Sequence, residues 1–213
     1  EFYNDLKADE HDRYRSWEHC YSHFMTARKE NDVNLDYLSL QLAFYLASWG
    51  MYRGSSFLLQ KDYRVHIPVV REILSNKYDS LAGIECKDFR NESNQKLLKE
   101  INEFIANYYD EIRREVRSSA LKNNLSETLI TKILMGILGC VPAYDRYFVK
   151  GIRSQKVAIG TYNIKSILQL VDFYEKNLEQ LDLVQKNFIV ADLLYPQMKI
   201  LDMGFWGGIA TLS

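Results

Sequence analysis

The sequence predicts an all-α fold, a single-domain multi-helix orthogonal array or bundle spanning residues 1–213. Apolar residues recur at spacings of three and four along most of the chain, which is the period of an amphipathic helix. Only three prolines and ten glycines interrupt 213 residues, too few for the many turns of a β fold. The hydrophobic share of 47% and the charged share of 26% are those of an ordinary globular protein.

The first part of the chain is expected to form two long helices followed by a short one. Residues 9–29 carry a helical stripe that consists of Tyr14, Trp17, Tyr21, Phe24 and Met25. Asn34 is a suitable N-cap for the second helix, and Pro68 suits the first turn of the short helix that follows. Residues 76–94 show little periodicity and are expected to form a loop.

Residues 37–52 contain no charged side chain and pose the question of a membrane span. A spanning helix needs about 20 apolar residues, and this run is shorter and is interrupted by Ser39, Gln41 and Ser48. A helix that is apolar nearly all round is the buried centre of a helical domain. We therefore expect residues 38–59 to be central in the core, and no contact with a membrane.

The second half of the chain continues the helical pattern. Residues 97–116 form the longest amphipathic stripe, with Glu and Lys on the opposite face. Asn124 and Glu127 have the spacing of a capping box, and Asn163 is a suitable cap for a later helix. The C-terminal apolar side chains Met198, Leu201, Phe205 and Trp206 are expected to dock on the body of the protein.

The three cysteines, Cys20, Cys86 and Cys140, are odd in number and widely spaced, so they do not form a disulfide framework. We expect a cytoplasmic protein. His19 and His23 have the helical spacing of two metal ligands, but the sequence offers no third. There is also no glycine-rich phosphate loop. We expect no metal and no cofactor.

The charges are unevenly distributed. Residues 113–156 contain nine cations and three acids, a net charge of +6, whereas the whole chain has −1. A basic patch on an otherwise acidic protein suits a nucleic acid or another phosphate-bearing ligand. The alternative interpretation is that these side chains point in different directions and form ordinary solvated faces.

The most informative segment is residues 124–151, in which two helices meet at a Gly-Cys-Val-Pro break. Asp145 and Arg146 follow that break and would form an acid–base or nucleophile-positioning pair, or simply begin a helix. Tyr144 would stack on a base or belong to the core. Lys132, Arg146 and Lys150 would contact phosphate. Arg53, at the end of the uncharged run, would need a carboxylate, a carbonyl or a ligand anion.

Two resemblances follow from these residues. The blocks WEHCY, FYLASWGMYRGSSFLLQ, LGCVPAYDRYF and YPQMKILDMGFW resemble a family of uncharacterised stand-alone bacterial proteins, which implies no activity. Residues 124–148 resemble part of the helix-hairpin-helix DNA glycosylase superfamily. That resemblance implies that Asp145 acts on the reacting sugar or its attacking nucleophile, and that backbone amides of the hairpin hold a phosphate. The corresponding residues, 122–125, include no glycine.

The leading hypothesis is therefore a nucleic-acid or nucleotide binding protein with a basic face at residues 113–156. A divergent base-processing activity would use Asp145 as its acid, and the sequence leaves open whether any reaction is catalysed. One alternative is a non-enzymatic protein-interaction module or homo-oligomer. Another is a small-molecule pocket around Trp49, Arg53 and Asp145.

Overall fold

Helices account for most of the computed structural model, which describes residues 9, 11–54, 56–116, 125–190 and 192–210. The all-α prediction is confirmed, because the described strands form only a hairpin in which β1 (Ile189–Val190) pairs antiparallel with β2 (Leu193–Leu194). The α-helices are α2 (Arg15–Ala27), α3 (Leu35–Ser48), α4 (Ile67–Ile73), α5 (Glu92–Val116), α6 (Glu127–Ile137), α7 (Arg146–Ser154), α8 (Ile164–Lys176), α9 (Leu178–Gln185) and α10 (Gln197–Ala210). The 3-10 helices are η1 (Phe57–Gln60), η2 (Tyr63–His66), η3 (Asn76–Leu81) and η4 (Cys86–Arg90).

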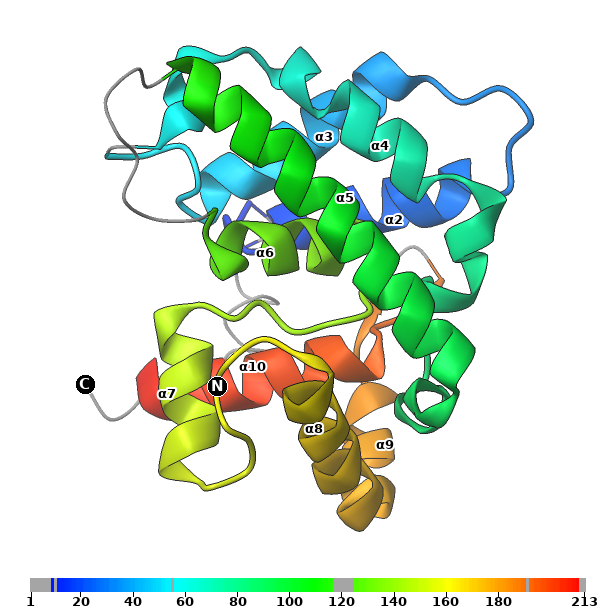
Figure 1. The fold of residues 1–213 in the computed structure, drawn as a ribbon. Helices are drawn as coiled ribbons and strands as arrows, with labels where there is room; N and C mark the ends of the chain where they lie inside the picture. Colours follow the sequence, from blue (N-terminus) through cyan, green and yellow to red (C-terminus); the bar gives the residue numbers. More distant parts are fainter. Residues whose placement is uncertain (1–8, 10, 55, 117–124, 191, 211–213) are drawn as a thin grey trace.

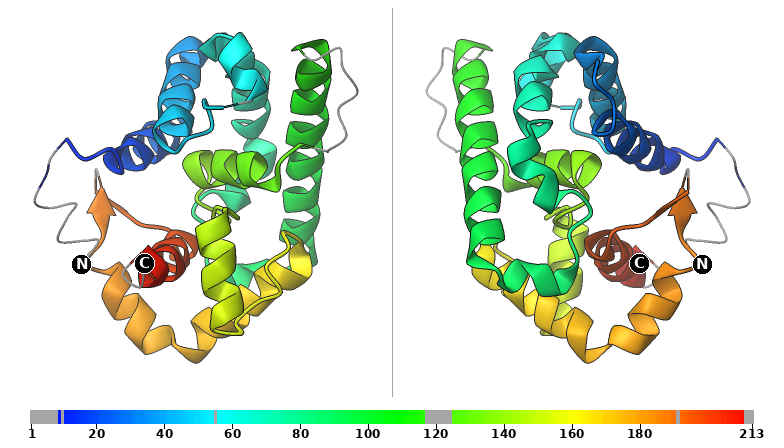
Figure 2. Two further views of the ribbon diagram at one scale, coloured as in Figure 1. Left: turned by 90° about the vertical axis from the view of Figure 1, so that its left-hand side faces the viewer. Right: turned by 90° about the vertical axis from the view of Figure 1, so that its right-hand side faces the viewer.

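The helices form two groups that share one core. Figure 1 shows α2 to α6 in the upper part of the molecule and α7 to α10 in the lower part. The views in Figure 2 show α5 along one edge and α8 and α9 meeting at the base, while α7 runs across the direction of α6. Buried apolar side chains from α2 through α8 and from α10 join into a single cluster, and α9 adds no buried residue to it.

Helix α6 is the most completely buried helix in the described chain, since every residue from Leu129 to Ile137 is buried. The sequence pointed to residues 38–59 instead, and this expectation is corrected. Helix α3 ends at Ser48 and leaves Tyr37, Leu40 and Phe44 exposed on one face. The absence of charge in residues 37–52 therefore does not mean that α3 is buried on all sides, because apolar side chains also occur on protein surfaces.

Two of the three expected asparagine caps are present in the described structure. The side chains of Asn34 and Asn163 accept hydrogen bonds from backbone N–H groups at the starts of α3 and α8, as expected. Asn124 lies outside the described residues, and Ser126 caps α6 by accepting from the Thr128 N–H. Pro68 lies in the first turn of α4, as predicted. The expected loop at residues 76–94 instead contains η3, η4 and the start of α5.

Two glycines allow helices to approach closely. A Cβ atom at Gly151 on α7 would lie 2.4 Å from the Phe205 carbonyl oxygen of α10. A Cβ atom at Gly136 on α6 would lie 2.6 Å from the ring of Tyr45 on α3. Because larger residues would separate these pairs, the two glycines determine how α7 meets α10 and how α3 meets α6.

The C-terminal segment docks as predicted, since Met198, Leu201 and Phe205 are buried on α10 and Trp206 is half-buried. Among the described helices, none is both long and apolar enough to span a bilayer.

A buried histidine links α4, α5 and the segment after α3. The ring of His66 is fully buried, with its Nε2 atom 2.6 Å from the Tyr52 hydroxyl and its Nδ1 atom 2.5 Å from the Tyr109 hydroxyl. Burial lowers the pKa of His66 to about 3. Between these tyrosines the ring is a neutral imidazole that donates from one nitrogen and accepts at the other.

This histidine makes stability depend on pH. An unfolded histidine binds a proton below its ordinary pKa of 6.5, whereas folded His66 does not until about 3. The free energy of unfolding should therefore fall by about 2 kcal/mol from this group between pH 7 and pH 5. His66→Gln, whose amide can serve both tyrosines, should reduce this slope in urea unfolding curves. His19→Gln removes an exposed histidine and should change the slope less than His66→Gln does; equal slopes in all three proteins would contradict the assignment.

Candidate functional site

One cleft of about 500 Å³ lies where several helices end, and we call it the Trp49 cleft. Its walls come from the segment before α2, the end of α3 and the loop after it, α6, the start of α7, and α10. The lining residues are Arg13, Tyr14, Ser48, Trp49, Gly50, Met51, Arg53, Thr128, Lys132, Asp145, Arg146, Tyr147 and Trp206. Among the described residues, four cations and one carboxylate give the lining a net charge of +3.

The floor of the cleft holds a buried ion pair. The Lys132 side chain from α6 is 3% exposed, and its Nζ atom lies 3.4 Å from Oδ2 of Asp145. The same ammonium lies 4.8 Å from the centre of the Trp49 ring, a cation–π contact. Burial lowers the pKa of Lys132, against the opposing effect of Asp145 and Asp202. The ammonium is therefore only partly compensated by its neighbours.

Asp145 is held in place by the helix that it begins. Its Oδ1 atom accepts hydrogen bonds from the backbone N–H groups of Tyr147 (3.0 Å) and Phe148 (3.1 Å), so it is the N-cap of α7. Its Oδ2 atom faces Lys132. Both oxygens are engaged, which gives this carboxylate a structural role as a cap and a counter-ion.

A second buried ion pair, Lys199 and Asp202, lies close to Lys132 and Asp145. Lys199 and Asp202, on α10, lie 2.9 Å apart, and Asp202 Oδ1 accepts a hydrogen bond from the Ala143 N–H (3.0 Å). Asp202 therefore ties α10 to the turn that leads into Asp145. The Lys199 ammonium lies 5.2 Å from the centre of the Trp49 ring. Two ammonium groups thus contact one indole.

Aromatic side chains form a wall of the cleft. Tyr14 packs against Trp49 and Trp206, with ring centres 5.1 Å and 5.8 Å apart, and Tyr147 packs against Trp206 at 5.6 Å. The Trp49 indole N–H is buried and has no acceptor within the described chain. The cleft therefore has an aromatic wall, and one of the rings in that wall carries a buried donor without a partner.

Three arginines are among the residues that line the cleft. Arg13 donates to the Tyr14 hydroxyl (3.0 Å), and the Arg146 guanidinium lies 4.6 Å from the centre of the Tyr147 ring. Arg53 is exposed and follows Gly50, whose backbone lies against its guanidinium. Within the described residues, no carboxylate forms an ion pair with any of the three. Unpaired guanidinium groups in the lining of one cleft are suited to an anion.

The structure unites four of the predicted site residues. Arg53, Lys132, Asp145 and Arg146 all line the Trp49 cleft, so Arg53 and Asp145 share a cavity. Arg53 is exposed rather than buried, so burial does not oblige it to find a partner. Lys150 is exposed one turn after Arg146 on α7 and is not among the lining residues.

Of the two roles considered for Tyr144, stacking on a base and a place in the core, the structure shows the second. Its side chain is 4% exposed, its hydroxyl lies 2.8 Å from the Ser166 hydroxyl, and its ring packs on Phe148. It is a core residue because the turn before α7 directs it inward while Asp145 faces the cleft. Sequence reasoning missed Arg13, Tyr14, Tyr147 and Trp206 as cleft residues.

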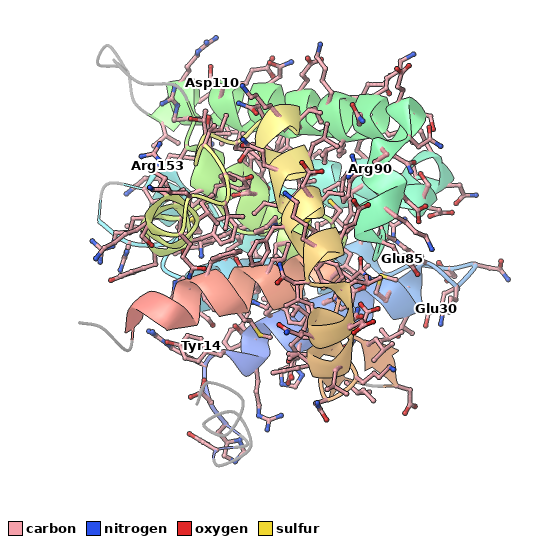
Figure 3. All side chains as sticks on the ribbon, turned by 90° about the horizontal axis from the view of Figure 1, so that it is seen from below. Tyr14, Glu30, Glu85, Arg90, Asp110 and Arg153 are labelled. Carbon is pink, nitrogen blue, oxygen red and sulfur yellow. The ribbon has the colours of Figure 1, made fainter. Side chains whose placement is uncertain are left out.

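The basic segment does not form one continuous face in the described structure. Arg113 and Arg114 each pair with Asp110 at 2.5 Å, and Arg153 donates to the carbonyl oxygens of Ile159 and Gly160. Figure 3 shows Asp110 and Arg153 well separated from Tyr14 at the cleft. Arg117 and Lys122 lie outside the described residues.

No metal or nucleophile site is evident in the part of the chain that is described. It contains no group of three His, Cys, Asp or Glu side chains with metal-binding geometry. His23 lies 3.0 Å from the Tyr37 hydroxyl. Cys20, Cys86 and Cys140 are buried and free, and burial raises the pKa of each thiol, which disfavours the reactive thiolate.

In comparisons with models of known families, with curated proteins and with solved structures, nothing matches this chain. Both resemblances therefore stay predictions. Residues 122–124, where the glycosylase superfamily has its hairpin, lie outside the described residues.

Replacing Asp145 separates its two roles. Asn caps helices as well as Asp does, so Asp145→Asn should retain the cap of α7 but remove the counter-charge of buried Lys132. We expect a loss of about 1–3 kcal/mol in the free energy of unfolding, measured with urea. Asp62, which caps η2 through the Arg64 N–H, pairs with no lysine among the described residues, and Asp62→Asn should change stability by less than about 0.5 kcal/mol. Equal losses in the two variants would refute the role of the ion pair.

Proposed function

We propose that the Trp49 cleft binds a nucleotide. The observation that carries this proposal is the combination, around one cavity, of three arginines without carboxylate partners, a buried lysine and a wall of aromatic rings. Phosphate is the anion that guanidinium groups recognise with paired hydrogen bonds, and a base is the partner that aromatic rings stack on. A volume of about 500 Å³ is within the range for a small-molecule site.

The distribution of cations favours a single nucleotide over a long strand. A strand needs cations along a continuous path, but Arg113, Arg114 and Arg153 are engaged elsewhere. The cleft instead recruits Arg13 and Arg53 from outside the basic segment. Charge is thus concentrated at a cavity rather than spread along a face, which suits a compact anion.

The floor of the cleft offers donors that a ligand can satisfy. Lys132 makes one long hydrogen bond, to Asp145, and the Trp49 N–H makes none to a described residue. Acceptors on the ligand, such as phosphate or carbonyl oxygens, would complete both groups. Because Asp145 is engaged through both oxygens, the proposal is for binding and includes no reaction.

Tryptophan fluorescence provides the test, since two of the three tryptophans line the cleft. Adding mononucleotides or dinucleotides should change the emission, and Arg53→Ala or Arg146→Ala should weaken the affinity about tenfold, the effect of losing a charge-assisted hydrogen bond. Lys156→Ala removes an exposed cation of the same basic segment outside the cleft and should have no effect. Equal effects of all three substitutions, or no binding of any nucleotide at low salt, would refute the proposal. Tighter binding of long oligonucleotides than of nucleotides would instead favour a strand.

The affinity should also fall at alkaline pH. Lys132 binds an anion only when protonated, and because its pKa is lowered from 10.5, the affinity should drop before an exposed lysine would titrate. The charged groups near it are Asp145, Asp202 and Lys199, and the phosphates are already ionised above about pH 7.

Lys132→Arg keeps the positive charge over this range and should remove the decrease. Adenosine, whose base does not lose a proton in this range, is the matched control ligand, and its binding should not depend on pH there. The same pH dependence in the wild-type protein and Lys132→Arg would exclude Lys132 as the cause.

A further inference from the structure

We infer that the ligand of the Trp49 cleft is a nucleoside di- or triphosphate whose phosphates are held by arginine in place of a metal ion. This inference rests on the proposed function and names its substrate class.

The cations of the cleft come from separate elements of the fold. Arg13 precedes α2, Arg53 follows α3 and Arg146 begins α7, so three separate elements each contribute one guanidinium. Arg13 and Arg146 are held by different rings, Tyr14 and Tyr147. Lys132 adds an ammonium at the floor. Three guanidinium groups and one ammonium carry more donors than the oxygens of one phosphate can accept from, so a chain of two or three phosphates can engage more of this set.

The charge of the cleft leads to the same ligand class. The described residues of its lining have a net charge of +3. A nucleoside monophosphate carries about −1.5 to −2 at neutral pH, and each further phosphate adds about −1. A di- or triphosphate therefore balances the cleft, while a monophosphate leaves it positively charged.

The residues described around the cleft include no carboxylate cluster for a magnesium ion. Asp145 is the only acidic side chain in its described lining, and its oxygens already accept from Tyr147, Phe148 and Lys132. Magnesium bound with a nucleotide usually has one or two carboxylate ligands from the protein. The guanidinium groups take over the neutralisation of charge that the ion provides elsewhere.

Isothermal titration calorimetry with the full chain tests this inference. The ligands are adenosine, AMP, ADP and ATP, the corresponding uracil series, and inorganic tripolyphosphate, each in EDTA and in excess Mg²⁺. We expect ADP and ATP, or their uracil counterparts, to bind at least tenfold more tightly than the monophosphate in EDTA. Excess Mg²⁺ should weaken binding, because the ion competes with arginine for the phosphates. Tripolyphosphate should compete with the nucleotide.

The outcomes separate this inference from the proposed function. Equal affinity for mono- and diphosphates, or a requirement for Mg²⁺, would overturn the inference and leave nucleotide binding intact. No binding of any nucleotide would overturn both. At least one of Arg13→Ala, Arg53→Ala and Arg146→Ala should bring the ratio of diphosphate to monophosphate affinity close to one, while Lys156→Ala leaves it unchanged. An unchanged ratio in all three arginine variants would also refute the inference.

Discussion

The buried charge of Lys132 is the constraint around which the neighbouring structure is organised. It lies on α6, whose residues from Leu129 to Ile137 are all buried. Burying an uncompensated ammonium group costs several kcal/mol of folding free energy. That cost is roughly as large as the whole free energy of unfolding of a small domain. The compensation comes from Asp145, from the face of Trp49 and, at longer range, from Asp202.

Each compensating group is held by a different element, and together they shape the site. Asp145 is oriented by the backbone N–H groups of α7, and the turn before it is tied to α10 by Asp202. Trp49 comes from the end of α3, and Gly151 lets α7 approach α10. The start of α7, helix α10 and the end of α3 all meet at Lys132, so the cleft forms there. Its floor retains hydrogen-bond donors that a ligand could satisfy.

Local features of the fold could be predicted from sequence and distant ones could not. The stripe of residues 97–116 and the caps Asn34 and Asn163 depend on neighbours within one or two turns, so the sequence alone identifies them. Helix α6 is more completely buried than α3 because of the helices that surround each of them. The composition of a segment does not indicate its neighbours. Helix α9 and the β1–β2 hairpin were missed because they are short.

The candidate site shows the same division. Asp145 and Arg146 were found because a helix start after a proline break is a local signal. Arg13 and Trp206 join them only through the packing of α10 and of the segment before α2. The basic segment of residues 113–156 was a real charge asymmetry, but the partners of its arginines could not be read from one sequence. A role of this basic segment in nucleic-acid binding stays a prediction. The formation of a homo-oligomer and a base-processing activity also stay predictions.

The most direct test of a ligand in the Trp49 cleft is a ¹⁵N NMR titration of the three indole N–H signals with ADP and UDP, assigned with Trp49→Phe and Trp206→Phe. Trp17 is an internal reference, because its indole N–H donates to the Met135 carbonyl oxygen inside the core (3.0 Å). The account predicts that the signals of Trp49 and Trp206 shift with saturation while that of Trp17 stays in place. Binding detected as heat while the Trp49 and Trp206 signals stay unchanged would place the ligand elsewhere and contradict the account.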